Sequence, residues 1–218
     1  MRDLSADEIM TILNTAKEMK AKIDNPSLRD DSLSKSSIVT LFYENSTRTK
    51  MSFMLAGDYQ GAIVKDLGVA TSSVSKGESL VDTGVTLDQM GINIMIIRHQ
   101  MTGAAHLLAK NVKASVVNAG DGSNEHPTQA LLDLFTIMEK KGSFEGLKVV
   151  ILGDISHSRV ARSNAFGLTK LGAKVTLAGP STLVSNSMKS LGVEVETDIP
   201  KAIKDADVVM GLRIQFER

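Results

Sequence analysis

The sequence predicts an α/β protein of two domains, each a parallel sheet flanked by helices. Short apolar runs, typical of buried strands, alternate with longer segments whose apolar residues recur at helical spacing. One of these runs, residues 92–97, contains no charged residue, as expected for a parallel strand covered on both faces. Such an alternation favours parallel sheets with right-handed crossovers.

The first half of the chain supplies the predicted first domain, residues 1–131. Ser5 and Glu8 form a capping box that opens the first helix. After a polar connector, strands and helices alternate as far as a loop at 118–122, and Pro127 then stands at the first position of a long helix. The expected strands are 38–43, 62–66, 92–97 and 114–117, and the expected helices are 47–59, 78–90, 103–110 and 127–140.

The second half, residues 132–218, restarts the alternation after Lys140-Lys141-Gly142 ends the long helix. The expected strands are 148–152, 174–178, 193–196 and 207–212, and the expected helices are 159–171, 182–190 and 200–205. Ligands of such sheets bind outside the carboxyl ends of the strands. Three polar segments there are therefore candidate sites: Ser46–Thr49, Arg98-His99 and Asn118–Gln129.

The bulk composition excludes several classes of function. The 218 residues contain 25 Lys+Arg and 25 Asp+Glu, so no overall field favours nucleic acid or an anionic membrane, and we expect neither as a partner. Cysteine is absent, which excludes disulfides, thiolate metal sites and a cysteine nucleophile, and fits a reducing compartment. No apolar run is long enough to span a bilayer. We therefore predict a cytoplasmic protein.

The segment Phe42-Tyr43-Glu44-Asn45-Ser46-Thr47-Arg48-Thr49 is the strongest candidate site. A buried strand ends here and a helix begins, so unpaired N–H groups and a partial positive charge are presented. Hydroxyls of Ser46, Thr47 and Thr49 and the guanidinium of Arg48 add the donors that suit a phosphate dianion. Ser-Thr alone is more often a plain helix cap. The whole string favours an anion site.

This string matches F-x-E-x-S-T-R-T, the carbamoyl-phosphate signature of the aspartate and ornithine carbamoyltransferases, and His126-Pro127-Thr128-Gln129 matches their second block. The chain resembles this transferase family over nearly its whole length. The resemblance implies that one set of residues binds carbamoyl phosphate: Ser46, Thr47, Arg48, Thr49, Ser72, Arg98, His126 and Gln129. It also implies a catalytic set: Arg48, Thr49, Arg98, His126 and Gln129.

Two of these residues also have ordinary interpretations. By itself, His126 is as often a helix cap as a site residue, and an arginine placed like Arg98 is more often solvated than functional. Near a helix start His126 should stay neutral, because the dipole disfavours added positive charge. It could then donate one hydrogen bond to a carbonyl oxygen. Gln129 can hold a carbamoyl NH₂ group through its side-chain oxygen.

The later half of the chain indicates which amine accepts the carbamoyl group. Arg159 resembles the family residue that binds a carboxylate of aspartate, and Arg213-Ile214-Gln215 matches the Arg-x-Gln of the aspartate branch. With Lys76, the implied L-aspartate site is Lys76, Arg159, Arg213 and Gln215. Two guanidinium groups fit a dicarboxylate and do not fit a cationic substrate. The implied product is N-carbamoyl-L-aspartate, a precursor of pyrimidines. The alternative is transfer to another amine such as ornithine.

The polar segment 67–77 resembles the mobile loop of this family, although its composition alone indicates a surface loop. The resemblance implies that Ser72 and Lys76 reach a neighbouring subunit, and hence a homotrimer with shared active sites. Whether regulatory chains attach is left open. No metal, nucleotide cofactor or covalent intermediate is required. The spacing G-x-G-x-x-G is absent around Gly153, which argues against NAD.

Two departures from the family pattern carry expectations of their own. Lys50 and Met54 replace residues that are often Arg and Glu, so we expect a local ion pair to be missing. The family continues beyond Arg218 with a His-Pro-Leu-Pro loop and a final helix that packs on the first domain. We therefore expect a C-terminally truncated fragment whose second domain is incomplete, with weak or no turnover. A form that binds carbamoyl phosphate without turnover is the second alternative.

Overall fold

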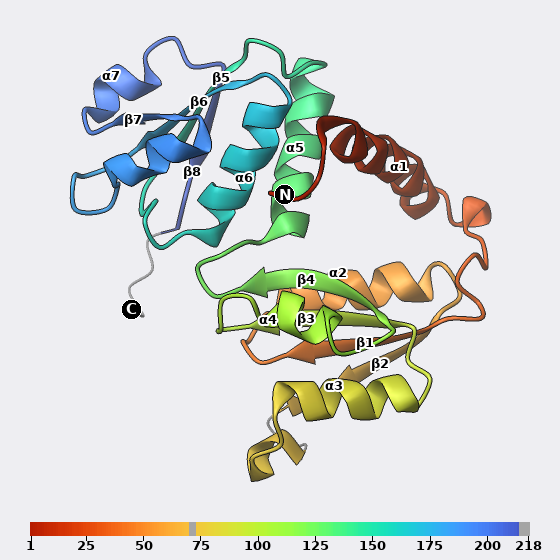
Figure 1. Cartoon of the computed structure of the whole chain (residues 1–218). Coiled ribbons are helices and arrows are strands. Elements are labelled where there is room, and N and C mark those ends of the chain that lie inside the picture. The colour runs from red at the N-terminus through yellow and green to blue at the C-terminus, as the bar shows by residue number, and fades with distance from the viewer. Residues whose placement is uncertain (70–72, 214–218) are drawn as a thin grey trace. The chain divides into compact units, whose positions relative to one another are not determined.

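The computed structural model describes the fold of residues 1–69 and 73–213 (Figure 1). The chain divides into two compact units, one of Met1–Lys17 with Glu125–Arg218 and one of Glu18–Asn124. Each holds a four-stranded parallel sheet with helices, so the predicted fold class is confirmed. The boundary at residue 131 was predicted to divide a carbamoyl-phosphate-binding domain from an aspartate-binding domain. That division by substrate stays a prediction.

The unit of residues 18–124, called here the β1–β4 unit, has the strand order β2-β1-β3-β4. All neighbouring strands are parallel. Its strands are β1 (Ser37–Phe42), β2 (Ile63–Leu67), β3 (Ile94–His99) and β4 (Ser115–Asp121). Its helices are α2 (Thr47–Asp58), α3 (Leu80–Gln89) and α4 (Ala104–Ala109), with short 3₁₀ turns η1 (Pro26–Leu28) and η3 (Ser73–Lys76).

Helices cover both faces of this sheet (Figure 1). Val39 and Leu41 pack in the cluster that contains residues of α3 and α4, whereas Ile38 and Phe42 pack in the cluster that contains Phe53 of α2. Successive strand residues point to opposite faces, so a strand with apolar residues on both faces must be covered twice. Strand β1 is thereby buried except for Ser37 at its start.

Lys50 forms an ion pair, although we expected a local ion pair to be missing here. Its Nζ lies 2.9 Å from Oδ2 of Asp66 on β2, and the hydroxyl of buried Thr40 donates to Oδ1 of the same carboxylate. The lysine stem extends from α2 to the neighbouring strand, so a partner on the sheet replaces one on the helix. These contacts attach the second turn of α2 to the sheet.

Replacing Gly84 by alanine should lower the free energy of unfolding by about 1–2 kcal/mol, although alanine favours helices by about 1 kcal/mol. A Cβ at Gly84 of α3 would lie 2.2 Å from Cδ1 of Leu108, which is fully buried. Denaturant unfolding measures the change. Thr86→Ala, an exposed position of the same helix, is the control and should shift stability by no more than about 0.5 kcal/mol. Equal stability of both variants would contradict this packing.

The other unit, called here the β5–β8 unit, has the strand order β7-β6-β5-β8, again all parallel. Its strands are β5 (Lys148–Leu152), β6 (Lys174–Ala178), β7 (Glu194–Glu196) and β8 (Val208–Gly211). Its helices are the first part of α1 (Ala6–Asp24), α5 (Pro127–Lys141), α6 (Arg159–Lys170) and α7 (Ile199–Ile203), with the 3₁₀ helix η4 (Asn186–Leu191).

One apolar core joins these elements. Side chains of α1, α5, β5 and α6 with no exposed surface meet in it: Ile9, Leu13, Leu134, Ile151 and Leu168. The capping box that was predicted to open α1 is present, since the Ser5 N–H donates to Oε2 of Glu8 (2.7 Å) and the Glu8 N–H donates to Oγ of Ser5 (3.2 Å).

Two local predictions were wrong. The expected α-helix at 182–190 is a 3₁₀ helix that begins at Asn186, because the Ser185 hydroxyl accepts from the Ser187 N–H and short polar side chains here compete for the backbone. The expected loop at 118–122 is mostly strand, since β4 continues to Asp121. Asp121 is buried and accepts from the Gly103 N–H and from the Asn118 amide, which stabilises the extended backbone.

Candidate functional site

The β1–β4 sheet has a topological switch point between β1 and β3. The chain passes from β1 to β2 on one side and then returns to place β3 on the other side of β1. Connections that diverge from two neighbouring strands leave a crevice outside their carboxyl ends, where open α/β sheets bind ligands. Strand β1 leads there into the segment 44–49, and Arg98 lies near the end of β3.

Arg98 is the centre of this edge. Its side chain is 16% exposed, and its Nε donates to Oε2 of Glu44 over 3.1 Å. Its Nη1 lies 3.4 Å from Oγ of Ser46, and its backbone oxygen accepts from the Tyr43 N–H. Glu44 therefore anchors the guanidinium beside the start of α2. The prediction that Arg98 lies beyond the strand was slightly wrong, since it is paired within β3 opposite Phe42.

The start of α2 suits an external anion. Ser46 is the N-cap residue with an extended backbone, but its side chain makes no capping hydrogen bond, and no acidic residue occupies the first turn. By contrast, Ser79 and Ser158 cap α3 and α6 with their side chains. Thr47 and Arg48 are exposed. A helix start without its own acceptor presents N–H groups and a positive end to a ligand.

The His-Pro-Thr-Gln block opens α5 in the β5–β8 unit. His126 is its buried N-cap residue, with no capping bond from the side chain, and Pro127 takes the first helical position. The His126 N–H donates to Oγ of Ser163 over 2.9 Å, and Ser163 donates to Oε2 of buried Glu125 over 3.2 Å. Gln129 donates through Nε2 to Asp133. The backbone at His126 is thus held by a buried polar chain.

The β5–β8 sheet has its own switch point, between β5 and β8. Arg159 begins α6 after β5, and Arg213 follows β8. The two strand ends are in close contact, because the Leu212 N–H donates to the Leu152 oxygen over 2.8 Å and a Cβ on Gly153 would lie 3.1 Å from Cβ of Leu212. The fold therefore brings both predicted aspartate-binding arginines to one edge of this sheet. Arg159 is partly buried and Arg213 is exposed.

For two other predicted site residues the structure gives the element and the exposure. Thr49 is partly buried in the first turn of α2, and Lys76 is exposed at the end of η3. Ser72 and Gln215 lie outside the described residues.

Four polar residues that contact the predicted site residues or, for Glu125, contact them through Ser163 were not identified from the sequence: Glu44, Glu125, Asp133 and Ser163. Two of them had a usable signal. Glu44 belongs to the eight-residue string, and Asp133 lies four positions after Gln129 on one helix face.

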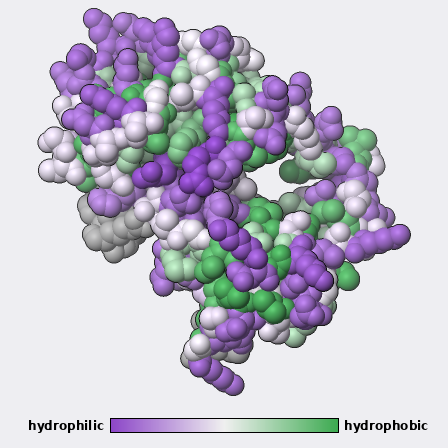
Figure 2. Space-filling view, viewed as in Figure 1, coloured by the Kyte–Doolittle hydropathy of each residue, from purple (hydrophilic) through white to green (hydrophobic). Residues whose placement is uncertain are grey.

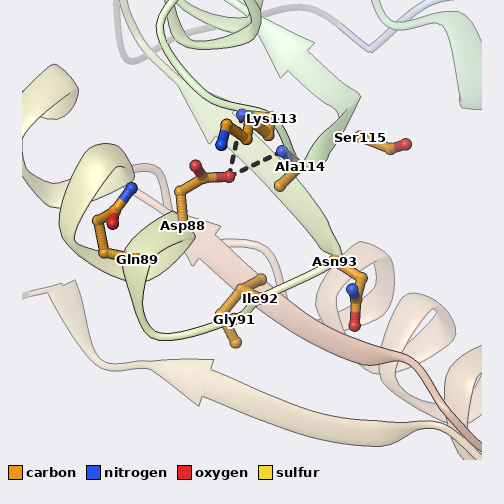
Figure 3. A pocket seen from close by; sticks show the side chains of 8 residues that line it. All are labelled: Asp88, Gln89, Gly91, Ile92, Asn93, Lys113, Ala114 and Ser115. Atoms are coloured by element: carbon orange, nitrogen blue, oxygen red, sulfur yellow. Dashed lines mark hydrogen bonds between the residues drawn. The ribbon is translucent and has the colours of Figure 1, made fainter.

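A shallow hollow of about 350 Å³ lies at the opposite, amino-terminal edge of the β1–β4 sheet (Figure 3). It is lined by residues that precede β3 and β4, and by Asp88, which accepts from the Lys113 and Ala114 N–H groups. None of the predicted site residues lines it. Within residues 1–69 and 73–213, no cluster of three or more His, Asp or Glu could hold a metal, and no helix could cross a membrane.

Comparison with known proteins agrees with this arrangement. A family described as aspartate/ornithine carbamoyltransferase, carbamoyl-P binding domain, matches residues 1–139. The aspartate carbamoyltransferase catalytic subunits of Ruminiclostridium cellulolyticum and Acetivibrio thermocellus are 61% and 62% identical over 218 residues, which is all of this chain and 70% of each relative. Aspartate transcarbamoylase from Trypanosoma cruzi in complex with carbamoyl phosphate has a TM-score of 0.90 at 31% identity, covering 100% of this chain and 71% of that one. The chain therefore belongs to the aspartate/ornithine carbamoyltransferase family.

Proposed function

We propose that this chain transfers the carbamoyl group of carbamoyl phosphate to the amine of L-aspartate, giving N-carbamoyl-L-aspartate and phosphate. The observation that carries the proposal is the largely buried Arg98 guanidinium, anchored by Glu44 beside the uncapped start of α2. Relatives that match the whole of this chain bear the name of this activity. The Trypanosoma cruzi enzyme, a structural neighbour, has been crystallised with carbamoyl phosphate, aspartate and N-(phosphonacetyl)-L-aspartic acid.

The phosphate end of the substrate would lie against the start of α2. Thr47, Arg48 and Thr49 supply the first helical turn, and Ser46 and Arg98 supply a hydroxyl and a guanidinium beside it. Charge-assisted hydrogen bonds of this kind are about twice as strong as neutral ones. Ser72 and Lys76 would extend this grip from a neighbouring subunit.

The carbonyl end would be polarised by Thr49, Arg98 and His126. The neutral amine of aspartate attacks the carbonyl carbon, the new C–N bond forms, and the C–O bond to phosphate breaks as the tetrahedral intermediate collapses. Donors aimed at the oxyanion contribute about 3 kcal/mol each in comparable sites. Gln129 would hold the carbamoyl NH₂. The departing phosphate is itself a base to which the amine proton can pass.

The acceptor would be selected at the edge of the β5–β8 sheet. Arg159 and Arg213 lie at the ends of two adjacent strands and offer guanidinium groups to two carboxylates, with Gln215 and Lys76 as further contacts. Ornithine has a cationic side chain, which this pair of arginines repels. The ornithine alternative is accordingly the weaker one.

The assembly would be a homotrimer with shared active sites in the cytoplasm. Exposed apolar side chains support an oligomer, and Figure 2 shows hydrophobic patches on the visible face of the β1–β4 unit. That unit carries most of the exposed large apolar residues: Ile23, Leu28, Met51, Leu55, Ile63, Val85, Met90, Met101 and Leu107. Regulatory chains would be a further partner, and size measurement of the native protein would reveal both.

Turnover with a panel of acceptor amines tests the reaction. Carbamoylaspartate formed from carbamoyl phosphate and L-aspartate is the expected product. Formation of citrulline from ornithine, with no product from L-aspartate, would support the alternative acceptor. Calorimetric binding of carbamoyl phosphate without any product would support the alternative in which the chain binds and does not turn over.

Arg48→Ala should weaken carbamoyl phosphate binding by about a hundredfold or more, because a bidentate contact to a charged ligand contributes roughly 1.5–3 kcal/mol per hydrogen bond. Isothermal titration calorimetry measures the dissociation constant. Arg29→Ala is the matched control: Arg29 lies over the Tyr59 ring at 3.7 Å in the same unit. The control should bind as the unmodified chain does. Unchanged affinity in Arg48→Ala would remove this residue from the site.

A further inference from the structure

Gln129 is part of a hydrogen-bonded network that joins two helices. Its Nε2 donates to Oδ1 of Asp133, one turn later on α5, over 2.9 Å. Oδ2 of the same carboxylate accepts from Nδ2 of Asn164 on α6 over 2.7 Å. That amide also donates to the Val160 oxygen over 3.1 Å, and Asn164 has no exposed surface. Two amide nitrogens therefore meet at one carboxylate.

The chemistry of this carboxylate determines which way the Gln129 amide points. An ionised carboxylate can only accept hydrogen bonds, whereas a glutamine side chain has one donating and one accepting end. The donating end of Gln129 is therefore committed to Asp133, and Oε1 remains to accept. The geometry points to Asp133 as a positioning residue that presents the oxygen of Gln129, and not its nitrogen, to the carbamoyl NH₂. This inference rests on the proposed function, which supplies the ligand of Gln129.

A purely structural role would not require a carboxylate at this position. Burial raises the pKa of Asp133, and the hydrogen bonds from Asn164 and Gln129 oppose that rise. No Lys or Arg forms an ion pair with Asp133 in the part of the chain that the structure describes. Asp133 is partly buried, and a carboxylate without a cationic partner costs more to desolvate than an amide or an apolar residue. The residue makes chemical sense where two amides must both donate.

Asp133→Asn tests the inference with almost no change of shape. The Val160 oxygen holds the Asn164 amide in its present orientation, so Nδ2 of Asn164 still points toward position 133 and requires an oxygen there. The NH₂ group of the new amide must then face Gln129. The Gln129 amide would turn over in response, so that the Gln129 oxygen accepts from the new amide and the Gln129 nitrogen faces the ligand. We expect the Kd for carbamoyl phosphate to rise by about tenfold or more, since two donors then face each other. The Kd for inorganic phosphate should stay within about twofold, because phosphate has no NH₂ group.

The double variant Asp133→Asn with Gln129→Glu supplies the decisive comparison. A glutamate accepts from the new amide with one oxygen and offers the other to the carbamoyl NH₂, so affinity should recover relative to Asp133→Asn. Gln129→Glu alone should bind poorly, because two carboxylates then adjoin. Glu139→Gln, at an exposed position of the same helix, is the control and should leave both dissociation constants unchanged.

Each outcome is decisive. If the unmodified chain does not bind carbamoyl phosphate, the proposed function fails. Suppose that the unmodified chain binds carbamoyl phosphate. The positioning role is then overturned if Asp133→Asn leaves the Kd for carbamoyl phosphate unchanged, or if it raises the Kd for inorganic phosphate by the same factor. Should Asp133→Asn fail to fold, side-chain amide NMR signals of Gln129 in the unmodified chain still decide. They should shift as Asp133 titrates, and signals that do not move would overturn the assignment.

Discussion

Replacing Arg98 by alanine is expected to lower kcat/KM for carbamoyl phosphate by about a thousandfold or more. The guanidinium would contact both the phosphate and the developing oxyanion, so ground-state binding and transition-state stabilisation are lost together. Steady-state kinetics with varied carbamoyl phosphate measures the loss. A decrease in kcat/KM of less than about tenfold would mean that Arg98 is a structural residue at the end of β3.

Arg98→Lys separates charge from geometry. Lysine keeps the positive charge but has no planar fork, so it cannot bridge Glu44 and Ser46 as the guanidinium does. We expect phosphate to bind nearly as well as to the unmodified chain, while turnover stays low. Glu44→Gln is the complementary variant. It retains a hydrogen-bond acceptor for Nε but removes the charge that anchors Arg98, and its effect should be smaller than that of either Arg98 variant.

Removing Arg159 and Arg213 together is expected to raise the KM for L-aspartate by about a hundredfold or more and to leave the Kd for carbamoyl phosphate unchanged. Each guanidinium would bind one carboxylate, and the loss of a charge-assisted contact costs about 1.5–3 kcal/mol. The single variants Arg159→Ala and Arg213→Ala should each show part of the effect. Turnover with varied aspartate, together with calorimetry for carbamoyl phosphate, checks both halves of this expectation.

The matched control for this pair is Lys189→Ala, an exposed cation of the same unit. It changes the net charge by the same amount as each single arginine variant, so it reports any general electrostatic attraction of the dicarboxylate. An equal rise in KM in the control would contradict a specific site at the ends of β5 and β8. A weakened Kd for carbamoyl phosphate in the double variant would instead indicate that the arginines act on the first substrate.

Much of the architecture was predictable because its signals are local. Strand β1 and helix α2 follow from an apolar run and a helix-start motif that adjoin in sequence, and the end of α5 follows from Lys141 and Gly142. One of the failures was also local. At 182–190 the apolar spacing suggested an α-helix, but the hydroxyls of Ser185 and Ser190 bond to nearby backbone groups and leave only a 3₁₀ helix.

The polar residues that support the site could not be found in the same way. Ser163 lies 37 positions from His126 along the chain, and Asn164 lies 31 positions from Asp133. Their contacts depend on how α5 packs against α6, and no periodic pattern specifies that register. Asp133 was within reach of a helical-spacing argument from Gln129. Its role emerges only when Asn164 is seen to share the carboxylate.

The sequence by itself determined the alternation of strands and helices, the helix start at α2 that we propose as the phosphate site, and the family, because each of these depends on residues that adjoin in the chain. Only the tertiary structure decided the strand orders, and with them the switch points that bring Arg98 to Ser46 and the loop of Arg159 to that of Arg213. The physical reason is that strand neighbours are chosen by the burial of both sheet faces, which involves side chains from distant parts of the chain.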